Sequence, residues 1–344
     1  MKKSHIFVGL LTLCTAAIVL TGCGSSSSSS TSSSKKDPQT GEAYPKTMKV
    51  GLMEGGPESA ILAKEGYLKD LGVKVKTTTY SSGTSINNAI VSKDLDAASF
   101  GVSPFALGVS NGVSYKAVGI SYVESGNIEA LVSKKSITSI KKLKGKTIGV
   151  TFGTTSQYAL VKTLKAAGIK TSQVKFKDLS GQNIVAAWKR GDIDAAYTWS
   201  PALNSIEKTG NVLSTDGKLK SQGVEIPEVS VVSTSFAKKY PTLTKKYEQA
   251  MLKVYKLVKN NPKKAIKDVA SWEGISESEA KSQITENDWL SGNVQESYLS
   301  SGKLAKILKT VEVFNKQQKN ISSVPSSSTM SDAIDASYVK KALK

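Results

Sequence analysis

Histidine and cysteine are almost absent from this chain of 344 residues. The one histidine is His5 and the two cysteines are Cys14 and Cys23, so no imidazole or thiol occurs after residue 23. This absence excludes Ser-His and Cys-His nucleophilic catalysis from the main part of the chain, together with metal sites built from His or Cys. Carboxylate chemistry is the one easy catalytic class that remains. We expect no catalytic residue, no metal ion and no cofactor.

Arginine is also nearly absent, since Arg190 is its one occurrence, yet the formal net charge is +19. The positive charge comes from lysines that are spread along the chain without an arginine-rich run. A surplus of this kind can mark a nucleic-acid-binding protein. Its even spread instead favours a solvated basic surface that faces anionic lipid and wall polymers. We therefore expect no nucleic-acid partner.

The first 22 residues are typical of a secretory signal. Lys2 and Lys3 precede a mostly apolar, uncharged stretch at residues 6–20, which is shorter than the roughly 20 residues that a membrane span needs. The stretch leads into Leu-Thr-Gly-Cys at residues 20–23, which resembles a bacterial lipobox. This resemblance implies cleavage before Cys23, lipid on its thiol, and attachment to the outer face of the cell membrane. Cleavage leaves a net charge of +17. An ordinary cysteine behind an ordinary signal is the alternative.

A serine-rich segment follows Cys23. Residues 25–34 are all serine apart from Thr31, and residues 35–45 continue in a similar polar style. Such a composition cannot bury enough apolar surface to fold. We expect residues 23–45 to form a disordered tether between the lipid and the folded part.

From residue 48 onward, short apolar strands alternate with helical stretches, which is typical of an α/β fold with largely parallel sheets. The predicted strands are residues 48–52, 73–80, 97–101, 130–132, 147–150, 174–176, 195–198 and 229–234. The predicted helices between them are residues 57–71, 84–91, 155–167 and 183–190, with a helical turn at 140–143. The chain then becomes helical at residues 242–260, 262–272, 276–287 and 299–318. These late helices would pack back on the first lobe, so the chain would cross between two lobes twice.

Several short motifs after residue 80 resemble one protein family. The longest is GQNIVAAWKRGDIDAAYTWSPAL at residues 181–203, and the others are SGTSI (82–86), GVSP (101–104), EALV (129–132), KGK (144–146) and TTSQY (154–158). They occur in the family's order over about residues 48–241. In this region the chain resembles the substrate-binding proteins of taurine, sulfonate and nitrate ABC importers, and the taurine-binding branch most of all.

The resemblance implies a type II periplasmic-binding-protein-like fold. In this fold, two α/β lobes are joined by two crossover strands, and the ligand binds in the cleft between them. Residues 128–133 and 228–234 would be the crossovers, residues 46–130 and 234–344 lobe one, and residues 131–233 lobe two. The implied partners of the monomer are a small anionic or zwitterionic ligand and an ABC permease with its ATPase. The implied role is binding, without catalysis.

A sulfonate is permanently charged and has three equivalent oxygens, so it needs several fixed hydrogen-bond donors. Helix N-termini supply such donors, because their first N–H groups are unpaired and the helix dipole favours an anion. Three predicted N-termini follow strands at the edge where α/β proteins bind ligands. They carry Ser82, Gly83, Thr84, Ser103, Thr154, Thr155 and Ser156, and we expect these residues to form an anion cradle. Plain helix capping is the alternative for each hydroxyl.

Taurine also has an ammonium group, which needs a carboxylate or an aromatic face inside a cleft. The resemblance places Glu228 and Glu129 at the two crossovers and makes Glu228 the first choice for the amine. Glu129 is equally suited to tie the hinge by hydrogen bonds. Trp199 could wall the cleft or belong to the core, and Tyr158 could donate to the sulfonate or cap the core.

The ligand itself stays open at this stage. Glu54 or Glu58 could face the cleft, and an extra carboxylate would favour a cation or zwitterion over a bare anion. The alternatives to taurine are an alkanesulfonate, nitrate, bicarbonate or a thiamine-type pyrimidine. A wall-associated adhesin or scaffold that uses the basic surface is an alternative of a different class.

Overall fold

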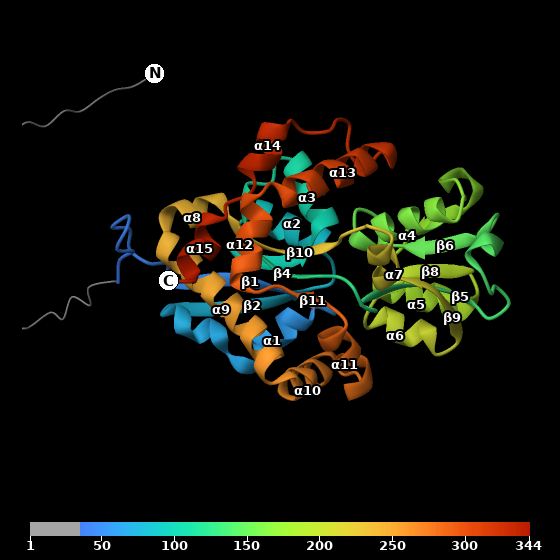
Figure 1. Cartoon of the computed structure of the whole chain (residues 1–344), viewed down its shortest axis with the longest axis horizontal. Coiled ribbons are helices and arrows are strands. Elements are labelled where there is room, and N and C mark those ends of the chain that lie inside the picture. The colour runs from blue at the N-terminus through green and yellow to red at the C-terminus, as the bar shows by residue number, and fades with distance from the viewer. Residues whose placement is uncertain (1–34) are drawn as a thin grey trace, which may run out of the picture. The chain divides into compact units, whose positions relative to one another are not determined.

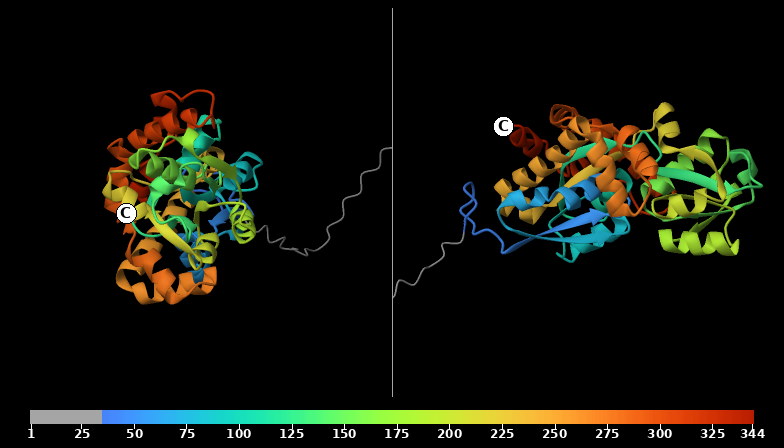
Figure 2. Two further views of the ribbon diagram at one scale, coloured as in Figure 1. Left: turned by 90° about the vertical axis from the view of Figure 1, so that its right-hand side faces the viewer. Right: turned by 90° about the horizontal axis from the view of Figure 1, so that it is seen from below.

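The computed structural model describes residues 35–344. The predicted signal peptide, the lipidation site Cys23 and the serine tract up to residue 34 lie outside the described residues. Residues 35–344 contain two lobes, each built around its own β-sheet, as Figure 1 and the right-hand view of Figure 2 show. The predicted fold class, α/β with two lobes, is therefore confirmed.

Lobe one contains a six-stranded mixed sheet in the order β11-β4-β10-β3-β1-β2. Its strands are β1 (Thr47–Met53), β2 (Lys74–Tyr80), β3 (Ala97–Gly101), β4 (Tyr115–Val123), β10 (Pro227–Ser233) and β11 (Asp288–Trp289). Strand β1 pairs in parallel with β2 and β3, whereas β10 runs antiparallel to β3 and β4. The antiparallel pairs arise because β10 brings the chain back from lobe two.

Helices cover both faces of this sheet, since successive strand side chains point to opposite faces. One face packs on α2 (Gly83–Val91), α3 (Val102–Ser110) and α13 (Lys303–Gln317). The other packs on α1 (Pro57–Glu65), η1 (Tyr67–Leu71), α9 (Pro241–Asn260), α10 (Pro262–Glu273) and α11 (Glu277–Thr285). The remaining helices of the lobe are α8 (Thr234–Lys239), α12 (Gly292–Ser300), α14 (Ser327–Asp332) and α15 (Ser337–Ala342).

Lobe two contains a five-stranded sheet in the order β7-β6-β8-β5-β9. Its strands are β5 (Glu129–Lys134), β6 (Thr147–Val150), β7 (Lys175–Asp178), β8 (Ala195–Trp199) and β9 (Gly210–Thr215). Its helices are η2 (Ile140–Leu143), α4 (Thr155–Ala166), η3 (Thr171–Gln173), α5 (Gly181–Arg190), α6 (Ala202–Glu207) and α7 (Asp216–Ser221). The side chains of α4 join the same buried cluster as α2, α3 and α13, so apolar packing continues from one lobe to the other on this side.

The chain passes between the lobes at two places, after β4 and after α7. Strand β5 lies wholly in the sheet of lobe two, and β10 lies wholly in the sheet of lobe one. The passages are therefore residues 124–128 and 222–226, next to the predicted crossover strands and not within them. Glu124 and Glu129 consequently flank the first passage.

Two predicted helices are interrupted by glycine in the structure. The helix expected at residues 57–71 ends at Glu65, and Gly66 (φ 67°) leads into the tighter η1. The helix expected at residues 299–318 begins only at Lys303, because Gly302 (φ 77°) separates α13 from α12. Such left-handed backbone angles suit glycine, which has no Cβ to clash, and they end an α-helix. Strands β4 and β9 were missing from the prediction.

Residues 35–45 differ from the expected disordered tether. They form a small hairpin, in which Lys36 and Ala43 are bridged and Tyr44 donates its N–H to the carbonyl of Lys35 (2.8 Å). The Asp37 carboxylate is fully buried and accepts hydrogen bonds from the N–H (2.9 Å) and Oγ1 (3.1 Å) of Thr242. Since Thr242 is in the first turn of α9, Asp37 caps a helix whose own N-cap residue makes no side-chain bond.

Among residues 35–344, no helix is both long and apolar enough to cross a membrane.

We predict that Asp37→Ala lowers the free energy of unfolding by about 1–2 kcal/mol, because the first N–H groups of α9 lose their acceptor. Asp37→Asn keeps an acceptor and should lose less than half as much. Urea unfolding followed by circular dichroism measures both. A chain truncated before residue 46 should lose at least as much stability as Asp37→Ala, and equal stability with the full chain would show that the hairpin contributes nothing.

Candidate functional site

A cavity lies between the two lobes. Lobe one contributes the loop after β1, the ends of β3 and β4 and the start of β10, and lobe two contributes the start of β5, the start of α4 and the end of β8. The lining residues that matter below are Glu54, Gly55, Gly56, Gly83, Phe100, Gly101, Tyr122, Glu124, Glu129, Thr154, Thr155, Trp199 and Glu228. The cavity therefore stands at the carboxyl ends of parallel strands, where α/β folds bind ligands.

Four helices begin at this cavity. Gly56, Gly101 and Thr154 are the N-cap residues of α1, α3 and α4, all three line the cavity, and none of these N-cap residues makes a side-chain capping bond. The start of α1 has a carboxyl of its own, because Pro57 has no N–H and the Glu58 carboxyl interacts with the N–H groups of Glu58 and Ser59. Helix α2 also begins here, at Gly83, but its N-cap residue Ser82 accepts a hydrogen bond from Ser85 N–H (3.2 Å). The starts of α3 and α4 therefore remain as the positions most favourable for an anion.

The two lobes are in contact around the cavity, so the structure has the closed arrangement. A Cβ atom placed on Gly101 would lie 2.4 Å from Cγ2 of Thr155 on the other lobe. On the opposite side of the cavity, a Cβ on Gly55 would lie 2.4 Å from the Ser200 carbonyl oxygen and 3.0 Å from Cδ1 of Trp199. Trp199 is 8% exposed and closes the cavity between the lobes.

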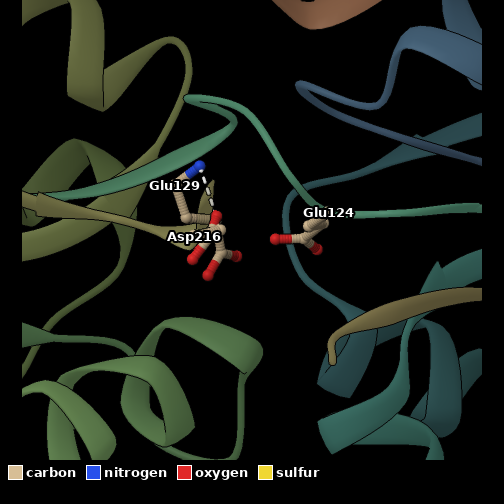
Figure 3. Close-up of side chains that lie close together, drawn as sticks. All are labelled: Glu124, Glu129 and Asp216. Atoms are coloured by element: carbon tan, nitrogen blue, oxygen red, sulfur yellow. Dashed lines mark hydrogen bonds between the residues drawn. The ribbon is translucent and has the colours of Figure 1, made fainter. Parts of the chain in front are cut away.

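Carboxyl groups gather at the same cavity, close to these helix starts. Glu124, Glu129 and Asp216 each have an oxygen within 4.8 Å of the others, and all three are buried. Figure 3 shows that Glu124 reaches this cluster from the side of lobe one and that Glu129 and Asp216 belong to lobe two. The Asp216 carboxylate accepts from the N–H of Glu129 (2.8 Å) and the hydroxyl of Tyr197 (2.8 Å). The acids therefore meet where the chain passes between the lobes.

Two more buried carboxyls, Glu58 and Glu228, extend this cluster into lobe one. Burial raises the pKa of Glu58 to about 7 and the pKa of Asp216 to about 6. Burial also holds the pKa of Glu228 well above its usual range, and the charges of Glu58 and Glu129 add to this effect. For Glu124, burial is again the largest cause of a pKa well above the usual range, followed by the charges of Asp216 and Glu129.

None of these five carboxyls forms an ion pair among residues 35–344. One oxygen each of Glu58, Glu124 and Glu129 also lacks a hydrogen-bond partner. Unpaired charge is expensive to bury, so the acids must hold protons or receive a cation from outside the chain. The oxygen set of Glu124, Glu129 and Asp216 could hold a hard metal ion, and it equally suits the N–H donors of an ammonium group.

Six of the eleven predicted ligand residues line the cavity, namely Gly83, Glu129, Thr154, Thr155, Trp199 and Glu228. The Oγ1 of Thr155 donates to Oε1 of Glu129 (2.6 Å), so Glu129 both faces the cavity and ties β5 to α4. Of the two acids near β1, Glu54 lines the cavity, whereas Glu58 is fully buried beside it. Ligand contact by any of these residues stays a prediction.

The other five predicted residues do not line the cavity. Ser82 and Thr84 share a hydrogen bond (2.9 Å) at the start of α2, and the hydroxyls of Ser103 and Ser156 are buried at the starts of α3 and α4. Tyr158 lies away from the cavity, because its ring packs edge-on against Phe314 of α13 at 5.1 Å. Tyr158 therefore joins the lobes, and its predicted contact with the sulfonate is not supported.

Sequence reasoning missed Tyr122, Glu124 and Asp216. Tyr122 is near the end of the unpredicted strand β4, and its ring packs against Trp289 at 4.9 Å. Asp216 begins α7, which was also unpredicted. The sequence signal that could have found Tyr122 and Glu124 is their place at the first passage between the lobes, whereas Asp216 has no such signal.

We predict that the ligand-free protein becomes less stable as the pH rises from about 4 to about 7. In this window the unfolded chain releases protons from carboxyls with ordinary pKa values near 4, whereas the folded protein retains them on Glu58 and Asp216. The stabilisation is complete below the unfolded pKa and is lost as the pH passes the folded pKa. The melting temperature should fall by several degrees from pH 5 to pH 7.5.

Glu228→Gln should flatten this slope, because it removes one of the interacting acids, whereas Glu277→Gln, an exposed acid of α11, should leave the slope unchanged. Differential scanning fluorimetry over pH 4.5–8 measures both variants. A melting temperature that rises steadily through this range would contradict the assignment of buried, unpaired acids.

Comparison with known proteins agrees with this geometry. Residues 60–265 match the family model described as NMT1/THI5 like. The taurine-binding periplasmic protein of Escherichia coli (strain K12) is 33% identical over 269 residues, which cover 76% of this chain and 84% of that protein. A putative aliphatic sulfonates-binding protein of Bacillus subtilis (strain 168) is 25% identical over 240 residues, 68% of each chain.

Among solved structures, the fold is similar to that of the alkanesulfonate-binding protein of Xanthomonas axonopodis pv. citri bound to MOPS. The TM-score is 0.70 at 17% identity, over 85% of this chain and 99% of that one. This likeness confirms the type II binding-protein fold. The curated relatives are named as binding proteins, which confirms the prediction of a binding protein and not an enzyme. The chain belongs to the NMT1/THI5-like family of substrate-binding proteins.

Proposed function

We propose that this protein captures taurine, or a similarly small aminosulfonate, outside the cell and delivers it to the permease of an ABC importer. The observation that supports taurine most directly is that one cavity combines two kinds of group. The uncapped starts of α3 and α4 line it, and so do the carboxyls of Glu124, Glu129 and Glu228, which have no basic partner in the described part of the chain. A short zwitterion with a permanent anion at one end and an ammonium at the other suits both kinds of group.

The sulfonate end would be held by the starts of α3 and α4. Lobe one supplies α3 and lobe two supplies α4, so the anion contacts both lobes only when they close. The helices hold these backbone N–H donors in place, and the donors do not titrate. They therefore suit an anion that never binds a proton. Closure would follow because this ligand binds the closed form better than the open form.

The ammonium end would be held by Glu228, with Glu129 and Glu124 beside it. All three carboxyls line the cavity and none is paired with a basic side chain in the described part of the chain. Nitrate, bicarbonate and alkanesulfonates bring no cation, so they would leave these acids uncompensated. The 33% identity to a taurine-binding protein supports the same ligand.

Membrane attachment through a lipid on Cys23 is part of this proposal. The lipobox-like Leu-Thr-Gly-Cys motif at residues 20–23 supports it, and it would place the binding domain beside its permease. Residues 35–45 form a hairpin, so the proposed tether is the serine tract at residues 25–34. Labelling with a radioactive fatty acid tests this point: Cys23→Ser should abolish incorporation.

Glu228→Gln should weaken taurine binding about tenfold or more, because it removes the charge from a hydrogen bond to the ammonium. Binding of ethanesulfonate, which has no ammonium, should change little. The matched control is Glu248→Gln, another fully buried carboxyl, which lies in α9 and does not line the cavity. Titration calorimetry of the wild type, Glu228→Gln and Glu248→Gln measures their affinities for the two ligands. Equal affinity of the wild type for taurine and ethanesulfonate would refute the role of Glu228.

Gly101→Ala tests closure. Alanine fits the backbone of Gly101 (φ −60°, ψ 153°), but its Cβ would collide with Thr155 in the closed form. We expect an intact fold and an affinity for taurine that is lower by about tenfold or more, since overpacking of this kind costs about 1–3 kcal/mol. Gly181→Ala is the control, because its Cβ would meet its nearest neighbour at an ordinary 3.5 Å. Small-angle scattering should show ligand-induced compaction in the control and not in Gly101→Ala.

A further inference from the structure

A second hollow lies on the outer surface between the lobes, at the helices α4 and α13. We call it the lysine groove: its rims are Lys162 and Lys165 on α4 and Lys306 and Lys309 on α13, and its floor is Val161, Val313 and Phe314. Figure 1 shows the two helices on the same side of neighbouring lobes. None of these residues lines the ligand cavity.

The lysine groove depends on the closed arrangement of the lobes. Phe314 of its floor packs edge-on against Tyr158 of lobe two, with ring centroids 5.1 Å apart. Nearby, Asn320 donates from Nδ2 to Oε1 of Gln157 across the lobes (3.0 Å). Separation of the lobes would break both contacts and divide the groove into two unrelated helix faces.

Four positive charges meet across this groove without a compensating charge. No Asp or Glu lines it, and none of its lysines forms an ion pair among residues 35–344. Each rim has its two lysines three residues apart, a spacing that puts them on one helix face. Burial and the charge of Lys165 lower the pKa of Lys162. Closure therefore brings like charges together, and an acidic partner would relieve their repulsion.

We infer that the lysine groove is a docking site for an acidic, partly apolar segment of a protein partner, and that it is complete only in the closed protein. The inference rests on the proposed function, since a partner that must recognise the loaded binding protein is the importer's membrane subunit. Contact with both rims would let that subunit distinguish the closed form from the open one.

The floor of the groove favours a polypeptide over an anionic polymer or lipid headgroup. Val313 is 42% exposed, although it lies on a helix of a well-packed domain, and Val161 and Phe314 continue the apolar surface. Glutamates or aspartates could pair with the rims while apolar side chains of the same segment cover this floor. A polyphosphate chain would leave the floor uncovered.

The test replaces the protein in its own cells by Lys162→Glu/Lys165→Glu or by Lys306→Glu/Lys309→Glu. The matched control is Lys263→Glu/Lys267→Glu, two exposed lysines of α10 without ion pairs. Uptake of labelled taurine should fall about tenfold or more for each groove pair, because like charges in an interface cost several kcal/mol. Taurine affinity by calorimetry and uptake by the control should be unchanged. Normal uptake by either groove pair would overturn the inference.

Two further measurements separate this inference from the proposed function. Failure of taurine and all other sulfonates to bind in calorimetry would refute the proposed function alone. The groove would then be judged by fluorescence anisotropy with a short helical peptide that has glutamates on one face and leucines on the other. This peptide should bind the wild type and the control, and bind the groove variants about tenfold more weakly. Equal peptide binding by the wild type, the control and both groove variants would overturn the inference. So would groove variants that bind the peptide normally and lose only their binding to phosphatidylglycerol vesicles.

Discussion

The site is governed by one electrostatic constraint: five carboxyls are buried in and beside a cavity in which residues 35–344 offer them no cation. Glu58, Glu124, Glu129, Asp216 and Glu228 are all within the folded core of the domain. Carboxylates in this state must take up protons or a foreign positive charge. An ammonium that enters the cavity would provide that charge. It would interact more strongly with these buried acids than with acids that are exposed to water.

The same constraint explains why the positive helix ends are needed. Under the proposed function, a cation alone would compensate the acids, but it would leave the uncapped starts of α3 and α4 without an anion. An anion alone would satisfy the helix ends and increase the repulsion from the acids. A ligand with both charges, separated by a short apolar link, would satisfy both kinds of group together. Selectivity would then come from the penalty that each wrong ligand leaves behind, in addition to the contacts it makes.

Much of this organisation could be predicted from the sequence, because strand ends, helix starts and the crossovers are local features. Thr154 and Thr155 follow from the start of α4, whereas Glu129 and Glu228, near the starts of β5 and β10, were assigned through the resemblance to binding proteins. Tyr158 could not be assigned in this way. It is only one turn into α4, but its direction is set by packing on Phe314, which is more than 150 residues away in the sequence. Asp216 joins Glu124 only through the return of the chain from lobe two, which no local pattern reveals.

Tyr158 also shows how the cavity and the outer surface are linked. Its helix, α4, begins at the cavity with Thr154 and Thr155. One turn further on, Tyr158 contacts α13, and Lys162 and Lys165 follow later on the same helix. Because a helix moves as a rigid body, a ligand that draws the start of α4 toward Gly101 must also bring the rims of the lysine groove together. The positive charges that then face each other oppose closure. The free energy from the ligand must therefore exceed this repulsion, and an acidic partner would add to the ligand's effect by reducing it.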